Sequence, residues 1–430
     1  MSLVQPFRAH LYRHESGADL SSVAAPPYDV VGPDERTRLL EHDAHNVVAL
    51  ELPDGPLDAG QPGNRYETGA ATWREWHEQG VLVEDQTPAL YVLQQEWEHS
   101  GRPVRRRAFI GAVELHPFSD GVVLPHERTL PKAIADRLEL TRATAANLSQ
   151  VFGLYSDREG ITDAAFDAAT GTPAEFVATD AAGVVSRVWA IRDPATITAV
   201  TEAIGRSAIY IADGHHRYTT ALAYRDERRA ADAAAGRAPV EPDYDRVMMA
   251  LVNMDDPDLI VLPTHRLARA DGPFDTAAFW DSLGGFFDLS EPDGHPAVAL
   301  AHADRTTFVV RTADGTTRIA RLREDVDPVV AIDNDHGPEW KRLDVAVLQE
   351  LILRPLFGIA ADDAASLARL SFVKDAHEAL KVEDADAAFI VASTRMDQLR
   401  AVAESGEVMP QKSTYFYPKL LSGLLLRSLD

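Results

Sequence analysis

The residues best suited to chemistry stand together in one short run, Asp213-Gly214-His215-His216-Arg217. A carboxylate, two imidazoles and a guanidinium within five positions can hold an anion and move a proton. Cations in the first turn of a helix cost roughly 0.3–1 kcal/mol each. A turn with a purely structural role would carry acids there, so the motif favours a phosphate site over a solvated helix start.

A strand, a tight turn and a helix must position these groups. Residues 208–212 are apolar and β-favouring, which predicts a buried strand, and a helix-forming run follows the motif. We expect Asp213 to cap that helix and Gly214 to let the backbone approach a ligand. The free N–H groups of the first helical turn would then face a phosphate.

Two further pairs of candidates follow predicted strands. His126 and Glu127 lie on a loop after a predicted hairpin, where chemistry is often found. Position 130 is Leu, so the pair lacks the second histidine of the HExxH zinc motif. His265 and Arg266 close another apolar strand, and Arg266 would stabilise charge on a transferred group.

Two loops complete the candidate set. The segment 409–419 places Lys412, Ser413 and Thr414 among three aromatic residues, which is typical of a ligand-contacting loop or of a segment packed by its rings. Tyr28 and Asp29 follow two prolines that fix an extended path. They would either line the pocket or pack the amino-terminal arm.

Composition narrows the function classes. The chain has 430 residues and a net charge of −25, without a basic stripe, so it is a poor candidate for binding nucleic acid. It has no cysteine, which excludes thiolate chemistry and disulfides. We expect a cytoplasmic protein, because neither a signal core nor an apolar run long enough to cross a membrane is found.

The pattern of elements predicts a mixed α/β fold with a central mixed sheet. We expect an amino-terminal α/β segment over residues 1–84, a central phosphate-binding domain over 85–270, and a carboxy-terminal α/β region over 271–430. Within the first segment, the run HNVVAL at 45–50 is predicted to form a strand.

Several separated motifs resemble a family of bacterial and archaeal proteins, the domain of unknown function 1015. They are APPYDVV, LPHERT with a downstream DRL, IADGHHRYTTAL, LVNMDDPDLIVLPTHRL and MPQKSTYFYPKLLSGLL. The resemblance runs almost from end to end. The turn Gly214-His215-His216-Arg217 also resembles that of the ParB/sulfiredoxin-like superfamily, which implies a strand–turn–helix site for nucleotide phosphates.

Within that superfamily the turn is most similar to that of free serine kinases, which transfer a phosphate from a nucleotide to serine. The resemblance implies that Asp213 is the catalytic or metal-facing acid and that His215, His216 and Arg217 contact phosphate. It makes Glu127 a candidate for the acid that deprotonates the acceptor. Sulfiredoxin chemistry is excluded because it needs a cysteine in the turn.

The sequence therefore predicts a nucleotide-dependent kinase for a small hydroxylated metabolite, with free serine the leading acceptor. Mg²⁺ held by Asp213, together with ATP or ADP, would serve as the cofactors. One alternative is a protein that binds a nucleotide or phosphometabolite without turnover and acts as a regulator. A second is metal-assisted hydrolysis by the histidines. The acceptor, the nucleotide, the pathway and the oligomeric state are not determined by the sequence.

Overall fold

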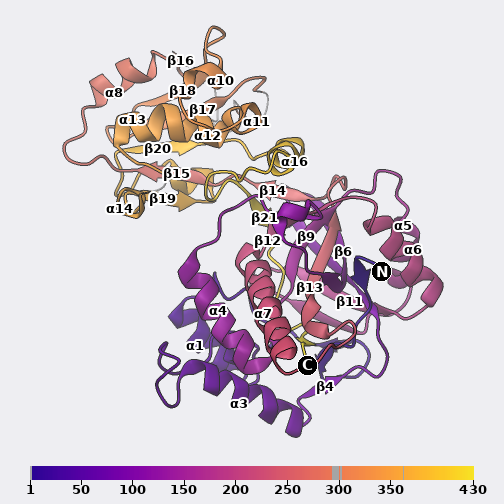
Figure 1. Cartoon of the computed structure of the whole chain (residues 1–430). Coiled ribbons are helices and arrows are strands. Elements are labelled where there is room, and N and C mark those ends of the chain that lie inside the picture. The colour runs from indigo at the N-terminus through magenta and orange to yellow at the C-terminus, as the bar shows by residue number, and fades with distance from the viewer. Residues whose placement is uncertain (1, 293–299, 301–302, 362) are drawn as a thin grey trace. The chain divides into compact units, whose positions relative to one another are not determined.

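A computed structural model describes residues 2–292, 300, 303–361 and 363–430 (Figure 1). The chain packs as two compact units. Unit 1 comprises Met1–Pro125, Thr129–Leu259 and Pro418–Asp430, and unit 2 comprises His126–Arg128 and Ile260–Tyr417. The predicted break after residue 84 falls inside unit 1, and the break after residue 270 falls inside unit 2.

Unit 1 is built on a large mixed sheet, as the sequence predicts. In its described residues the order is β3-β10-β11-β5-β6-β13-β9-β12-β7, with β1 paired to β6. The strands are β1 (Val4–Gln5), β3 (Ala18–Asp19), β5 (Leu90–His99), β6 (Arg102–Glu114), β7 (Val123–Leu124), β9 (Val151–Tyr155), β10 (Phe176–Thr179), β11 (Val185–Ile191), β12 (Ile209–Asp213) and β13 (Arg246–Asn253). Two small pairs join β2 (His10–Tyr12) to β4 (Leu82–Glu84) and β8 (Ala146–Asn147) to β22 (Arg427–Ser428).

Helices lie on both sides of this sheet (Figure 1). They are α1 (Pro33–His42), α2 (Val48–Glu51), α3 (Arg65–Glu78), α4 (Pro131–Thr144), α5 (Asp163–Thr170), α6 (Pro194–Ile204) and α7 (His215–Ala234), with 3-10 turns at Phe118–Asp120 and Asp243–Asp245. A sheet covered on both faces needs strands that are apolar throughout rather than alternating. β9 and β13 fit this, because every residue of β9 is buried, as is every residue of β13 except the last, which is half-buried.

The strand predicted at 45–50 is wrong, because the chain turns there and starts the short helix α2. Asn46 is fully buried, and its amide donates to the carbonyls of Ser22 and Ala24 at 2.8 Å. Its side-chain oxygen accepts from the N–H of Val48 at 3.0 Å. The asparagine thus satisfies the groups at the start of a helix, and the apolar residues after it pack as a helical turn.

Unit 2 is a smaller α/β unit. Its sheet has the order β16-β18-β17-β20-β15-β19, and β14 pairs with β21. The strands are β14 (Ile260–Leu262), β15 (His265–Ala268), β16 (Phe287–Ser290), β17 (Thr307–Thr312), β18 (Thr317–Leu322), β19 (Leu370–Val373), β20 (Ala387–Ile390) and β21 (Tyr415–Tyr417).

The helices of unit 2 are mostly short. They are α8 (Thr276–Leu283), α10 (Pro328–Ala331), α11 (Pro338–Lys341), α12 (Asp344–Leu348), a π-helical turn at Gln349–Leu353, α13 (Arg354–Phe357), α14 (Ala364–Leu367), α15 (Ala376–Ala379) and α16 (Met396–Glu404). None of the helices in the described part of either unit has the length and apolar run needed to span a bilayer.

Candidate functional site

The predicted strand–turn–helix is present in unit 1. β12 ends at Asp213, Gly214 forms the turn, and α7 begins at His215. The capping role predicted for Asp213 is wrong, since Gly214 is the N-cap and no described side chain caps the helix. Gly214 has φ +88°, so the turn needs a left-handed residue that glycine supplies without strain. Asp213 stays in the strand, and its carboxylate is left for other partners.

Gly214 is also closely packed, which leads to a stability prediction. A Cβ at this position would lie 2.9–3.0 Å from the Arg217 guanidinium. Gly236, just after α7, is a matched control, because its φ is +67° and a Cβ there would meet open space. We expect Gly236→Ala to cost about 1 kcal/mol and Gly214→Ala at least about 1 kcal/mol more in urea unfolding. Equal losses would mean that the Arg217 side chain moves freely.

Asp213 is held by two cations. Its Oδ2 lies 3.1 Å from Lys419 Nζ and 3.6 Å from Arg217 Nη2. Burial by itself would raise the pKa of Asp213, but attraction to Lys419, Arg217 and His215 outweighs burial and lowers the pKa to about 2. Asp213 is therefore ionised throughout the physiological range.

A third cation adds to this cluster. Arg106, on β6, is 2% exposed, and its Nη2 donates to the carbonyl of Pro418 at 2.5 Å. Burial lowers the pKa of Arg106 to about 9, and Asp213 opposes that shift. Arg106, Arg217 and Lys419 thus surround one carboxylate. The three positive charges exceed the one negative charge of Asp213, so the cluster has a net positive charge that would attract an anion such as a phosphate.

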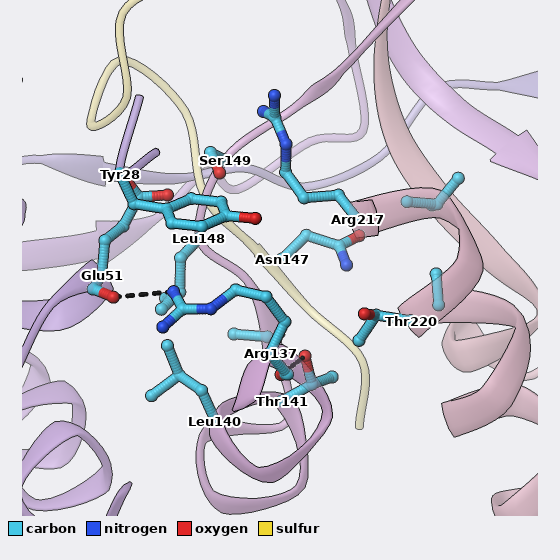
Figure 2. Close-up of a pocket in the computed structure, with 13 residues that line it drawn as sticks. Tyr28, Glu51, Arg137, Leu140, Thr141, Asn147, Leu148, Ser149, Arg217 and Thr220 are labelled. Carbon is cyan, nitrogen blue, oxygen red and sulfur yellow. Dashed lines mark hydrogen bonds between the residues drawn. The ribbon is translucent and has the colours of Figure 1, made fainter. Parts of the chain in front are cut away.

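Arg217 connects this cluster to a small pocket. One end of its guanidinium pairs with Asp213, and the other donates to the backbone carbonyl of Gln150. The same side chain lines a cavity of about 50 Å³ (Figure 2). The polar residues around that cavity are Tyr28, Glu51, Arg137, Thr141, Asn147, Ser149, Arg217 and Thr220.

Glu51 is the titratable acid of the pocket. It is the last residue of α2 and is 2% exposed. Burial raises the pKa of Glu51 above its usual 4.5, although hydrogen bonding from Ser149 and the charges of Arg217 and Arg137 act in the opposite direction. A carboxyl with a raised pKa beside cations is a candidate proton acceptor for an incoming hydroxyl.

Arg137 holds the pocket wall together. Its Nη1 donates to the backbone carbonyl of Glu51 at 2.7 Å, as the dashed line in Figure 2 marks. Its Nη2 pairs with Asp136 at 2.6 Å, and its guanidinium lies 4.4 Å from the centre of the Tyr28 ring. Burial raises the pKa of Tyr28, so its phenol remains neutral at physiological pH. Arg137 therefore positions Glu51 and Tyr28.

Of the other residues predicted for the site in unit 1, some lie beside the cationic cluster or the pocket and others do not. His215 is buried, and its charge interaction with Asp213 places it beside the cluster. His216 accepts a hydrogen bond at Nε2 from the N–H of Leu130, at 2.9 Å, so that nitrogen is used to hold the start of α4. Tyr28 lines the pocket, whereas the neighbouring Asp29 is exposed and is not among the lining residues.

The remaining predicted residues belong to unit 2, where the structure brings two separated motifs together. His126 Nε2 lies 3.0 Å from Thr414 Oγ1, and Arg266 Nη2 donates to the Lys412 carbonyl at 3.2 Å. Ser413 donates to the carbonyl of Pro410 at 2.5 Å.

Glu127 and His265 lie in the same unit. Glu127 is half-buried. Burial, aided by the charge of Arg266, lowers the pKa of His265 to about 4, so this histidine is neutral at physiological pH. Its Nδ1 accepts a hydrogen bond from the N–H of Val391 at 3.3 Å.

The family model described as "Protein of unknown function (DUF1015)" matches residues 4–346. The chain belongs to the DUF1015 family. No curated protein matches it.

Solved structures similar to this DUF1015 chain include a mutant free serine kinase in complex with ADP, at 10% identity and TM-score 0.34, over 72% of this chain and 86% of that one. A carboxy-terminally truncated SbnI from Staphylococcus aureus matches at 11% identity and TM-score 0.35, over 74% and 86%. A conserved hypothetical protein from Pyrococcus furiosus matches at 12% identity and TM-score 0.32, over 73% and 93%. Likeness at these scores does not bear on function.

Four residues of the site were missed from the sequence: Glu51, Arg106, Arg137 and Lys419. Lys419 belongs to the KSTYFYPK run, so its motif was a usable signal. Arg106 stands in the short basic run RPVRRR at 102–107, and Glu51 has no motif around it. Only the fold brings either residue to the site. Within the described ranges, His, Cys, Asp and Glu side chains do not gather in groups of three that could hold a metal ion.

Proposed function

We propose that unit 1 is a nucleotide-dependent phosphotransferase that acts on a small hydroxylated metabolite, with free serine as the leading acceptor. The observation that carries the proposal is the position of Arg217. Its guanidinium contacts Asp213 in the cationic cluster and also lines the pocket that contains Glu51. A phosphate donor and a hydroxyl acceptor must meet in this way for phosphoryl transfer.

The donor phosphates would bind at the start of α7. Arg106, Arg217 and Lys419 supply the positive charge, and the free N–H groups of the helix add a favourable dipole. The buried Gln150 Oε1 has no hydrogen-bond partner among the described residues, so a polar group remains for a ligand. Asp213, ionised at neutral pH, would supply an oxygen ligand to Mg²⁺ bound with ATP or ADP.

The acceptor hydroxyl would enter the pocket beside Glu51. As its oxygen bonds to the transferred phosphorus, the bond from that phosphorus to the nucleotide's leaving oxygen breaks. The proton released from the hydroxyl goes to the Glu51 carboxylate. The cavity of about 50 Å³ has room for the reacting end of an acceptor.

Several sequence-based assignments remain predictions. Glu127 stays an alternative proton acceptor for the hydroxyl. The residues predicted to contact phosphate from unit 2 are Arg266, Lys412, Ser413 and Thr414, with His126 and His265 as pocket candidates. Asp29 stays a pocket candidate from unit 1. Comparing the turnover of Glu51→Gln with that of Glu127→Gln would show which acid accepts the proton.

A second candidate function is binding of a nucleotide or phosphometabolite without turnover. The observation that favours it is the pairing of Asp213 with two cations, because a paired carboxylate is less available to a metal ion. An enzyme should lose turnover in Asp213→Asn, and a sensor should retain its ligand. Nucleotide binding measured in that variant distinguishes the two.

The direct test is a thermal-shift titration of the full chain with Mg²⁺ and ATP, ADP, pyrophosphate or sulfate. A ligand at 100 times its Kd stabilises the folded state by about 2.7 kcal/mol, which raises the midpoint by several degrees. We expect Arg217→Gln to abolish the shift. Arg229→Gln is the matched control, because Arg229 lies on the same helix and its side chain is 53% exposed. If no phosphate compound shifts the wild type, the proposal fails.

A further inference from the structure

A second cavity of unit 1 is independent of the phosphate cluster. It has a volume of about 250 Å³, enough for a small metabolite. Segments far apart in the sequence form it: the chain around residues 5–10, residues 84–88, Ala112, the chain from 241 to the start of β13, and the chain around 427–430. Arg246 and Arg427 are its buried basic residues.

Arg246 has no partner for its charge within the described ranges. The residue is 6% exposed, and its Nη1 is enclosed without a hydrogen-bond acceptor in the described part of the chain. Among the same residues, the guanidinium forms no ion pair. Burying a charged group without a counterion is unfavourable, and proteins usually pair such a group or place it against a ligand. The start of β13 thus keeps a costly cation at the wall of a cavity.

Arg427 increases the positive charge at this place. It is 2% exposed, and its Nη1 donates to the backbone carbonyl of Arg246 at 3.2 Å. Asp243 pairs with Arg427 Nη2 at 2.6 Å. Burial and the repulsion from Arg246 lower the pKa of Arg427 to about 10, although Asp243 opposes the shift. Among the residues that the structure describes, the carboxylate of Asp243 compensates Arg427, and Arg246 has no ion pair.

The exposed rim of the cavity carries mostly the opposite charge. Its exposed charged residues are the acids Glu84, Glu241, Asp243 and Asp430 and one base, Arg8. Glu84 lies 3.9 Å from Arg8, and Asp430 pairs with Arg228 at 2.8 Å, whereas Glu241 has no ion pair among the described residues. A cation-rich floor below an acidic rim is complementary to a molecule with an anionic and a cationic end.

We propose that this cavity binds a free α-amino acid, with its carboxylate against Arg246 and its ammonium group toward Glu241. A guanidinium is well suited to a carboxylate because its N–H groups match the two oxygens. A simple inorganic anion would satisfy Arg246 but would make no use of the acidic rim.

The strand geometry separates this site from the acceptor pocket. Arg246 and Val247 are consecutive in β13, and successive side chains of a strand point to opposite faces of the sheet. Arg246 lines the present cavity and Val247 lines the pocket that contains Glu51. Amino-acid binding at Arg246 therefore does not depend on the proposed phosphotransfer.

The test uses the full chain and each proteinogenic L-amino acid in turn, in thermal-shift and calorimetric titrations. Amino-acid amides and N-acetyl amino acids, which each lack one charged end, are the chemical controls. We expect an amino acid to raise the midpoint of the wild type, with binding at least tenfold weaker for both blocked forms. No shift with any amino acid would overturn the proposal.

Two variants then show which of the two cavities binds the amino acid. Arg246→Gln should abolish the shift without lowering the midpoint of the unliganded protein, because it removes an uncompensated charge. Glu51→Gln should leave the shift intact. The reverse pattern, loss in Glu51→Gln and retention in Arg246→Gln, would place the amino acid in the acceptor pocket and overturn this proposal while supporting the kinase.

A surface variant tests the proposal even if Arg246→Gln does not fold. Glu241 is exposed, so Glu241→Gln should fold normally. In this variant we expect the preference for the free amino acid over its N-acetyl form to disappear, while the preference over the amide remains. An unchanged preference for the free ammonium group would show that Glu241 does not contact it and would contradict the proposed orientation.

Discussion

Replacing Glu51 by Gln should lower kcat for phosphoryl transfer by about 10²–10⁴-fold, because the acceptor hydroxyl loses its proton acceptor. Nucleotide binding should persist, since the cationic cluster at Asp213 does not include Glu51. Gln nearly preserves the size of the side chain and its place in the buried wall, so the fold should be retained. The measurement is steady-state kinetics with Mg²⁺, ATP or ADP and serine, together with the thermal shift produced by the nucleotide.

Glu127→Gln is the matched control. Both variants remove one carboxylate, but Glu127 is half-buried in unit 2, whereas Glu51 is 2% exposed in the pocket of unit 1. If Glu51 is the proton acceptor, Glu127→Gln should retain kcat within a few fold. A large loss in Glu127→Gln with normal turnover in Glu51→Gln would restore the assignment made from the sequence.

The pH profile gives a further check on Glu51. A base works in its deprotonated form, so activity should rise with pH through the pKa of Glu51 and then level. Because burial raises that pKa, the acid limb should lie above the pH expected for an ordinary glutamate. A profile that stays flat down to about pH 4.5 would be inconsistent with Glu51 in this role.

The parts of the site that depend on neighbouring residues in the sequence could be predicted. The apolar run before Asp213 and the helix-forming run after Gly214 each indicate their own element, and β12 and α7 are both present. The mixed α/β class follows from the same kind of pattern. The capping role assigned to Asp213 failed because the strand continues one residue further, which leaves Gly214 at the N-cap.

Site residues that are far from the turn in the sequence could not be predicted in this way. Glu51 follows an apolar run that reads as a strand, and the hydrogen bonds of buried Asn46 turn that run into a helix instead. Lys419 reaches Asp213 across some two hundred residues of sequence because the chain returns to unit 1 at Pro418. Such pairings depend on tertiary packing, which propensity and periodicity do not encode.

The ion pairs of Asp213 should contribute strongly to stability. The pKa of this carboxyl falls from an ordinary 3.8 to about 2 on folding, which corresponds to about 2 kcal/mol at neutral pH. Because the folded-state pKa is the lower one, this contribution is present above about pH 4 and is lost as the pH falls toward 2. Its side chain is only 21% exposed, so solvent screens the interaction weakly.

We therefore expect Asp213→Asn to lower the free energy of unfolding by about 2–4 kcal/mol at pH 7, since Lys419 and Arg217 lose their shared counterion. The difference from wild type should shrink between pH 4 and pH 2. Lys419→Met in the same background removes one uncompensated cation, so the double variant should recover at least about 1 kcal/mol. Urea unfolding of the wild type, the two single variants and the double variant measures this coupling. Strictly additive losses would show that Asp213 and Lys419 do not interact, and would remove the cationic cluster as the basis for a phosphate site.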